Sequence, residues 1–122
     1  MSFVPAETLS QLRTLNQSTI DALPFGVVKL EGNGKILLYN KYESELGNVP
    51  IAQALGKNFF TEVAPCSNNR LFRGRFEAGV AAGKLNELFG YTFTYRMAPT
   101  NVEVHMLHDA PSGTNWLFVR RK

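Results

Sequence analysis

The chain has 122 residues, of which 44% are hydrophobic and 19% charged, and its formal net charge is +3. This mixture is typical of one globular domain and argues against intrinsic disorder, which needs fewer apolar residues and more net charge. The mild charge argues against a nucleic-acid surface, and the single cysteine argues against disulfides or a multi-cysteine zinc site. The sequence also lacks the long apolar stretch of a membrane span and the basic and apolar start of a secretory signal. We therefore expect a cytoplasmic protein.

The first expected element is helical and covers residues 6–23. Leucines recur within it at roughly helical spacing, at Leu9, Leu12 and Leu15. Pro24 ends the region, because proline cannot continue a helix. We therefore expect residues 1–23 to form an N-terminal helical cap and residues 24–122 to form the core of the domain.

Two short strands follow the cap. Residues 25–30 are rich in β-formers, and residues 36–40 return after a tight turn. The dipeptide Asn33-Gly34 lies in that turn and tolerates the positive φ that tight hairpins require. The pattern predicts a β-hairpin.

An irregular region occupies residues 41–65 and ends at Cys66. Glycine, asparagine and proline interrupt it repeatedly, at Gly47, Asn48, Pro50, Gly56 and Pro65. We expect only short helical turns here, at residues 41–46 and 51–55. A segment of this kind usually lines a site rather than fills space.

The clearest longer helix is expected at residues 71–82. Its apolar residues share one face, at Phe72, Phe76 and Val80. Gly83 is a natural C-terminal stop.

Three strands are expected after this helix. Residues 86–97 alternate aromatic and small or polar side chains, with period two, so they predict a strand with an aromatic face. Residues 102–106 and 115–120 continue the sheet. The whole order predicts an α+β domain with a five-stranded antiparallel sheet and helices across one face.

Cys66, the only cysteine, ends the run Val63-Ala64-Pro65-Cys66. A free cysteine is most often a small buried hydrophobe. The alternatives are a nucleophile or an attachment point, because Pro65 restricts the backbone and holds the thiol at a defined angle. His105 and His108 are candidates for a base in a thiol enzyme, but no third residue is apparent that would orient them.

Tyr39 and Glu43 lie four residues apart, where a strand gives way to a helical turn. Both side chains can therefore point into one pocket and hydrogen-bond a third acidic group. Burial would raise the pKa of the carboxyl, which would then keep its proton. The alternative is a surface glutamate beside a partly buried tyrosine.

Read together, these residues resemble the photoactive yellow protein family, small bacterial blue-light receptors built on a PAS domain. The resemblance runs from about Pro24 to the C-terminus, and the first twenty residues match poorly. The stretches that carry it are Gly56-Lys57-Asn58-Phe59-Phe60, Val63-Ala64-Pro65-Cys66, Tyr91-Thr92-Phe93 with Tyr95, Met97 and Pro99-Thr100, Tyr39-Asn40 with Glu43, Val104-His105-Met106, and Trp116 with Phe118-Val119.

The resemblance implies a PAS fold and a photoreceptor rather than an enzyme. It implies that p-coumaric (4-hydroxycinnamic) acid is joined to Cys66 as a thioester and that Tyr39 and Glu43 hydrogen-bond its phenolate oxygen. Light-driven trans–cis isomerisation, proton transfer from Glu43 and partial unfolding would then give a reversible signalling state. The implied pocket-lining residues are Phe59, Val63, Pro65, Phe93, Tyr95 and Met97.

Two positions depart from the family pattern. Gly47 stands where the family often has a threonine, and Val49 where it often has an arginine. The threonine hydroxyl would support Tyr39, and the arginine would shield the pocket from solvent. We therefore expect a less well-held phenolate, part of it protonated and blue-shifted near neutral pH.

The alternative function is a PAS module that binds another small ligand or only contacts proteins, without photochemistry. It would not need Cys66, Tyr39 and Glu43 together. As partner we expect a downstream signalling protein of unknown identity, with no nucleic acid or membrane involved, and the chain itself as a monomer or weak dimer.

Overall fold

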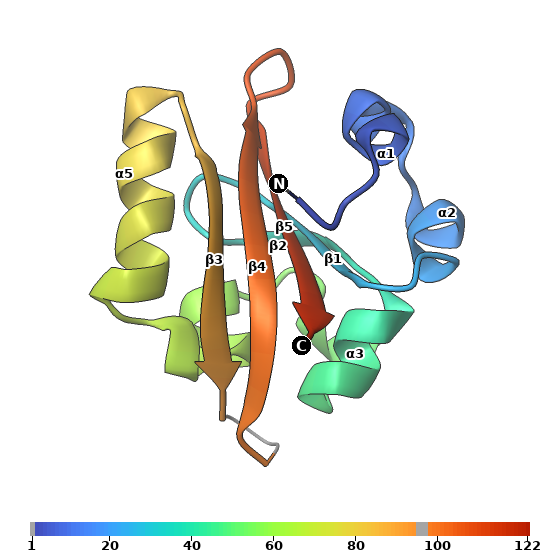
Figure 1. The fold of residues 1–122 in the computed structure, drawn as a ribbon, viewed down its shortest axis with the longest axis vertical. Helices are drawn as coiled ribbons and strands as arrows, with labels where there is room; N and C mark the ends of the chain where they lie inside the picture. The colour runs from blue at the N-terminus through green and yellow to red at the C-terminus, as the bar shows by residue number, and fades with distance from the viewer. Residues whose placement is uncertain (1, 95–97) are drawn as a thin grey trace.

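The structure is a computed structural model that describes residues 2–94 and 98–122. Within them, five strands form one antiparallel sheet in the order β2-β1-β5-β4-β3 (Figure 1). This confirms the predicted sheet. The strands are β1 (Gly26–Leu30), β2 (Ile36–Tyr39), β3 (Asn86–Phe93), β4 (Thr100–Asp109) and β5 (Thr114–Arg121).

The helical elements are short and lie before β1, between β2 and β3, and nowhere else in the described chain. Two of them, η2 and η4, are single π-helical turns on either side of Cys66. The elements are α1 (Ala6–Ser10), η1 (Leu12–Thr14), α2 (Gln17–Asp21), α3 (Lys41–Gly47), α4 (Ile51–Ala54), η2 (Phe59–Val63), η3 (Pro65–Ser67), η4 (Arg70–Gly74) and α5 (Arg75–Ala82).

The predicted hairpin is confirmed. Val28 of β1 pairs with Tyr39 of β2, and Gly34 in the turn has a φ of 93°. Asn33 does not share that left-handed conformation; its side chain instead accepts a hydrogen bond from the Lys35 N–H at 3.0 Å. Tyr39 is the last residue of β2, and only Asn40 separates it from the start of α3.

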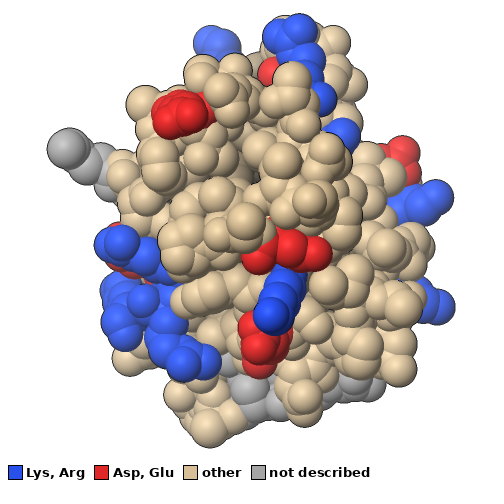
Figure 2. Space-filling model, turned by 90° about the vertical axis from the view of Figure 1, so that its right-hand side faces the viewer, with Lys and Arg blue, Asp and Glu red and all other residues tan. Residues whose placement is uncertain are grey.

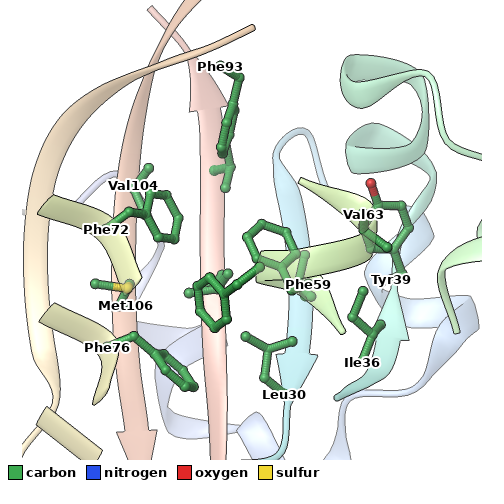
Figure 3. Packing of buried hydrophobic residues seen from close by; sticks show 14 of the residues in the cluster. Leu30, Ile36, Tyr39, Phe59, Val63, Phe72, Phe76, Phe93, Val104 and Met106 are labelled. Carbon is green, nitrogen blue, oxygen red and sulfur yellow. The ribbon is translucent and has the colours of Figure 1, made fainter. Parts of the chain in front are cut away.

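Hydrophobic residues are buried on both faces of the sheet. Figure 1 shows α5 on one side of the sheet and α1 and α2 on the other. The larger cluster lies under α3 to α5, where the rings of Phe59, Phe72 and Phe76 fill the space between the helical elements and the sheet (Figure 3). The smaller cluster lies under α1 and α2 and consists of Val4, Leu12, Ile20, Phe25, Val27, Trp116 and Phe118.

The cap is more broken than the leucine spacing predicts. Gln11 leaves the helical conformation, with φ −118° and ψ 22°. Asn16 then starts a new helix through a capping box with Thr19. The predicted helix at 6–23 is therefore three short pieces, α1, η1 and α2.

Two other boundaries differ from the prediction. The helix at 71–82 begins with the π-helical turn η4, whose Phe72 N–H is capped by the Asn69 side chain at 3.0 Å. The strand predicted for 86–97 ends at Phe93, since Thr94 is no longer paired. Residues 95–97, and with them the predicted pocket residues Tyr95 and Met97, lie outside the described residues.

The surface that carries α1, α2 and α3 mixes both signs of charge. Figure 2 shows acidic and basic side chains spread over this face, with Lys and Arg gathered toward one lower edge. That distribution is typical of a solvated surface rather than of a basic stripe for nucleic acid. In the described residues, no helix has the length and apolar character needed to cross a membrane.

Candidate functional site

A small cavity lies where α3, η3 and the end of β3 meet. Three of its lining residues are the predicted site residues Tyr39, Glu43 and Cys66, which the fold brings together from separate elements. The complete lining is Tyr39, Glu43, Leu46, Gly47, Val49, Val63, Ala64, Cys66 and Phe93.

Tyr39 and Glu43 are placed by the junction between β2 and α3. Tyr39 is the last residue of β2, and Glu43 lies in the first turn of α3. Both are buried, with exposed fractions of 1% and 4%. The alternative of a surface glutamate is therefore wrong, because α3 turns its first turn inward against β1.

Burial controls the protonation of this pair. Loss of solvent raises the pKa of Glu43 to about 8. Burial, and secondarily the charge of Glu43, raises the pKa of Tyr39 far above its ordinary value. Near neutral pH both groups therefore keep a proton that they can donate.

The polar atoms of the pair are poorly satisfied within the protein. The Tyr39 hydroxyl lies 3.5 Å from the backbone carbonyl of Glu43, the outer limit of a hydrogen bond. Glu43 Oε1 is buried and has no hydrogen-bond partner among the described residues. An unsatisfied buried oxygen costs about 1–3 kcal/mol, so the site is suited to a further hydrogen-bonding group.

Cys66 lies in the turn η3 and is half-buried against the larger hydrophobic cluster. Its backbone carbonyl is held from two directions, because it accepts a hydrogen bond from the Tyr91 hydroxyl and one from the Asn69 amide at 3.2 Å. Asn69 also contacts the Tyr91 hydroxyl at 2.6 Å. This arrangement fixes the backbone that carries the thiol.

Two predicted lining residues do not line this cavity. Phe59 is fully buried in the aromatic cluster, with its ring centroid 5.4 Å from that of Phe60 and 6.0 Å from that of Phe72. Pro65 is the first residue of η3, and its ring supports the turn beside Cys66. Gly47, Val49, Val63 and Phe93 do line the cavity.

The two histidines are engaged elsewhere. The His105 ring contacts Ser2 Oγ at 2.6 Å and Asn86 Oδ1 at 2.7 Å, and burial lowers its pKa. The His108 ring contacts Asn115 Oδ1 at 2.6 Å. Neither is among the cavity-lining residues, so the geometry does not pair a base with Cys66.

The donor groups and the apolar walls suit a ligand with an apolar body and one hydrogen-bonding end. The cavity is lined by the Cys66 thiol, the Tyr39 hydroxyl and the Glu43 carboxyl, whose Oε1 has no hydrogen-bond partner in the part of the chain that the structure describes. The free space is about 20 Å³, room for roughly one water molecule. An aromatic ring therefore enters only if the walls move outward.

Asn40 was not predicted as part of the site, although an asparagine before a helical turn is a known N-cap signal. Its side-chain oxygen accepts hydrogen bonds from Val27 N–H at 2.9 Å and Glu43 N–H at 3.1 Å. Its amide donates to the carbonyls of Ile20 at 2.7 Å and Phe25 at 2.9 Å. One buried side chain thus joins the cap, β1 and the helix of Glu43.

The cap makes two further polar contacts with the same junction. Gln17 of α2 donates to the Tyr39 carbonyl at 3.0 Å. Asp21 accepts a hydrogen bond from the Lys41 N–H at 2.8 Å. One contact is to Tyr39 itself, and the other is to Lys41, which lies between Tyr39 and Glu43 in the chain.

Comparison with known families supports the fold assignment. The PAS fold family matches residues 14–115 of the chain. That match leaves out the first thirteen residues, which include α1.

Individual relatives are similar over most of their length. The chain is 44% identical over 107 residues to the photoactive yellow protein of Rhodothalassium salexigens, covering 88% of this chain and 86% of the relative. It is 39% identical over 112 residues to that of Halochromatium salexigens, covering 92% and 90%.

A solved structure agrees with both comparisons. The photoactive yellow protein domain of the sensor histidine kinase Ppr from Rhodospirillum centenum superposes with a TM-score of 0.85 at 39% identity. The match covers 91% of this chain and 97% of that domain.

Proposed function

Because the chain belongs to the photoactive yellow protein family of PAS-fold photoreceptors, we propose that it senses blue light through p-coumaric acid held as a thioester on Cys66. Proteins of this family are photoreceptors and not enzymes. The observation that supports the proposal best is the meeting of Cys66, Tyr39 and Glu43 at one cavity.

When bound, the p-coumaroyl group supplies absorption of blue light and a double bond that light can isomerise. The protein supplies the polar end of the site. The hydroxyl of Tyr39 and the protonated carboxyl of Glu43 would donate hydrogen bonds to a phenolate oxygen, because both hold their protons at neutral pH. A buried phenolate is costly unless it is hydrogen-bonded in this way.

Glu43 is the proton donor in this proposal. Release of its proton toward the bound group would leave a carboxylate in an apolar pocket. Its desolvation penalty is several kcal/mol, a large part of the roughly 5–15 kcal/mol that stabilises a domain. Relaxation that brings water to Glu43 is therefore favoured.

The cap is the element that relaxation releases. Asn40 bonds both to Glu43 N–H and to the Ile20 carbonyl of the cap, so a shift of α3 weakens the hold on α2. The cap, residues 1–23, then separates from the core, residues 24–122. The loosened form is the signalling state, and it returns thermally to the dark form.

One spectroscopic experiment, carried out on the parent protein and on Cys66→Ala, tests the proposal. Activated p-coumaric acid is added to the purified protein, and the visible spectrum is recorded before, during and after blue light. We expect a yellow adduct that bleaches in blue light and recovers in darkness, and no adduct with Cys66→Ala. The absence of a visible band, or a band that survives Cys66→Ala, contradicts the proposal.

The same spectra separate the alternative function. A PAS domain that only binds another ligand or a protein would form no light-bleachable adduct. A photoactive yellow protein domain occurs within a sensor histidine kinase, which supports a downstream signalling protein as the partner of this chain. The partner of this chain and its cytoplasmic location stay predictions.

A further inference from the structure

Gly26 occupies a position that does not need glycine for its backbone. It is the first residue of β1 and pairs with Val119 of β5. Its φ is not in the left-handed region, unlike that of Gly34, Gly56, Gly83 and Gly113. The reason for the missing side chain must therefore lie in what surrounds it.

The Glu43 carboxyl lies directly against the bare Cα of Gly26. A Cβ at this position would overlap Glu43 Oε1 and lie 3.2 Å from both Glu43 Cδ and the Val119 carbonyl oxygen. The atom that it overlaps is the same oxygen that has no hydrogen-bond partner among the described residues. Gly26 thus leaves the room that this oxygen occupies.

Neither backbone can yield easily to a methyl group. The strand β1 lies between β2 and β5, with Gly26 itself paired to Val119 of β5 and the pairing to β2 beginning at Val28. The first turn of α3 is fixed by Asn40, which binds both the Glu43 N–H and the Val27 N–H. A side chain at position 26 therefore has to displace the carboxyl itself.

We propose that Gly26 is a positioning residue: because it has no side chain, it leaves the space in which the Glu43 carboxyl lies in the core and faces the cavity. The proposal deepens the proposed function, since it concerns the placement of the proton donor. It also stands alone as a statement about two residues of the protein without any bound group.

A double-mutant cycle on the apoprotein tests the pairing. The variants are Gly26→Ala, Glu43→Ala and the double variant, compared with the parent chain by urea unfolding at one pH. We expect Gly26→Ala to raise the unfolding constant about 5- to 150-fold in the parent, the range typical of overpacking. In the Glu43→Ala background the same change is expected to be neutral or stabilising, because the clash is gone and alanine restricts the unfolded chain.

Gly32→Ala is the matched control. Gly32 also lacks a left-handed φ, and a Cβ there meets only Val80 at 3.5 Å, an ordinary contact. Its effect is expected to be the same with and without the Glu43 side chain. Equal effects of Gly26→Ala in both backgrounds overturn the proposal, and so does failure of both proteins that carry Gly26→Ala to fold. If the single variant Gly26→Ala fails to fold and the double variant folds, the proposal is supported.

Infrared spectroscopy reports the environment of the Glu43 carboxyl, which a general loss of stability does not change. The C=O stretch of the protonated Glu43 carboxyl is assigned by its loss in Glu43→Gln. We expect Gly26→Ala to shift this band and Gly32→Ala to leave it unchanged; an unshifted band in Gly26→Ala contradicts the proposal. If the cycle shows coupling but no p-coumaroyl adduct forms, the proposed function fails and the role of Gly26 stands.

Discussion

The enclosed Glu43 side chain links protonation to folding. Its pKa rises from an ordinary 4.5 to about 8 in the folded protein because of burial, so the folded state keeps a proton that the unfolded chain has lost. The stability that this proton confers is complete below about pH 4.5 and is lost as the pH rises to about 8. The loss for the apoprotein is on the order of 3–5 kcal/mol.

Urea unfolding of the apoprotein from pH 5 to pH 9 measures this loss, with Glu43→Gln as the control. His105 contributes with the opposite sign, because burial lowers its pKa and destabilises the fold as the pH falls. That contribution is common to both proteins and cancels in their difference. Parallel stability profiles for the two proteins would show that Glu43 does not titrate in this range.

Gly47 determines how well Tyr39 is supported. A Cβ at this position would lie 3.4 Å from the Tyr39 hydroxyl oxygen, an ordinary contact that leaves room for a small side chain. Gly47→Thr therefore places a hydroxyl near that oxygen. In the adduct we expect the phenolate to persist to a pH lower by about one unit, the effect of roughly one added hydrogen bond.

A pH titration of the visible spectrum measures that shift, and Gly47→Ala is its control because it adds the same Cβ without a hydroxyl. A parent adduct that stays anionic down to strongly acidic pH would contradict the expectation of a weakly held phenolate. Equal titrations of the Thr and Ala variants would show that the hydroxyl does not reach Tyr39.

At the scale of elements, the junction of β2 and α3 is held by one asparagine. Asn40→Ala removes four buried hydrogen bonds and leaves their backbone partners unsatisfied. We expect a loss of about 2–4 kcal/mol in the free energy of unfolding. Asn40→Asp keeps the two acceptor contacts and loses the two donated ones, to the Ile20 carbonyl of the cap and to the Phe25 carbonyl beside it. The expected loss is therefore smaller, and it weakens the contact between α2 and the junction.

Urea unfolding gives the total loss, and amide hydrogen exchange shows where it falls. Asn40→Asp is expected to speed exchange in α2 more than in α3, whose N-cap it preserves. Equal acceleration in both helices would mean that Asn40 does not connect them.

The elements were predictable where a local pattern repeats. The Asn33-Gly34 turn and the alternating aromatics of β3 predicted strands, because turn chemistry and period two act within a few residues. The π-helical turns were not predicted, since nothing local distinguishes them from an α-helix. The roles of Gly26 and Asn40 depend on contacts with residues distant in the chain, which no periodicity reveals.

The candidate site was predictable only in part for the same reason. The spacing of Tyr39 and Glu43 indicated that both could point into one pocket, but it left a surface glutamate open, because their burial depends on how α3 packs against β1. Placing Cys66 opposite them depended on resemblance to a family. Phe59 was expected at the cavity wall and instead fills the core, because its ring packs among Phe60 and Phe72.

At the scale of the molecule, the sheet separates two hydrophobic clusters. The cap covers only the smaller one, while the cavity belongs to the larger one. The cap can therefore separate from the sheet without disrupting the packing of the larger cluster, which holds the site. Regions with few buried contacts open at lower free energy than the rest of a domain.

Hydrogen exchange of the adduct under continuous blue light tests this order of opening. We expect amides of α1 and α2 to exchange at least tenfold faster than in darkness, and amides of β4 and β5 to change much less. A uniform increase over the whole chain would indicate global unfolding, and protection of the cap would contradict its release.

The narrow cavity has a consequence for how the protein is assembled. A space of about 20 Å³ is too small for an aromatic ring, so the proposed p-coumaroyl group would fit beside Cys66 only after the walls move outward. On that proposal, we expect attachment to follow the rate of these openings. Mild loosening of the apoprotein with urea would then speed attachment, and an unchanged rate would contradict this expectation.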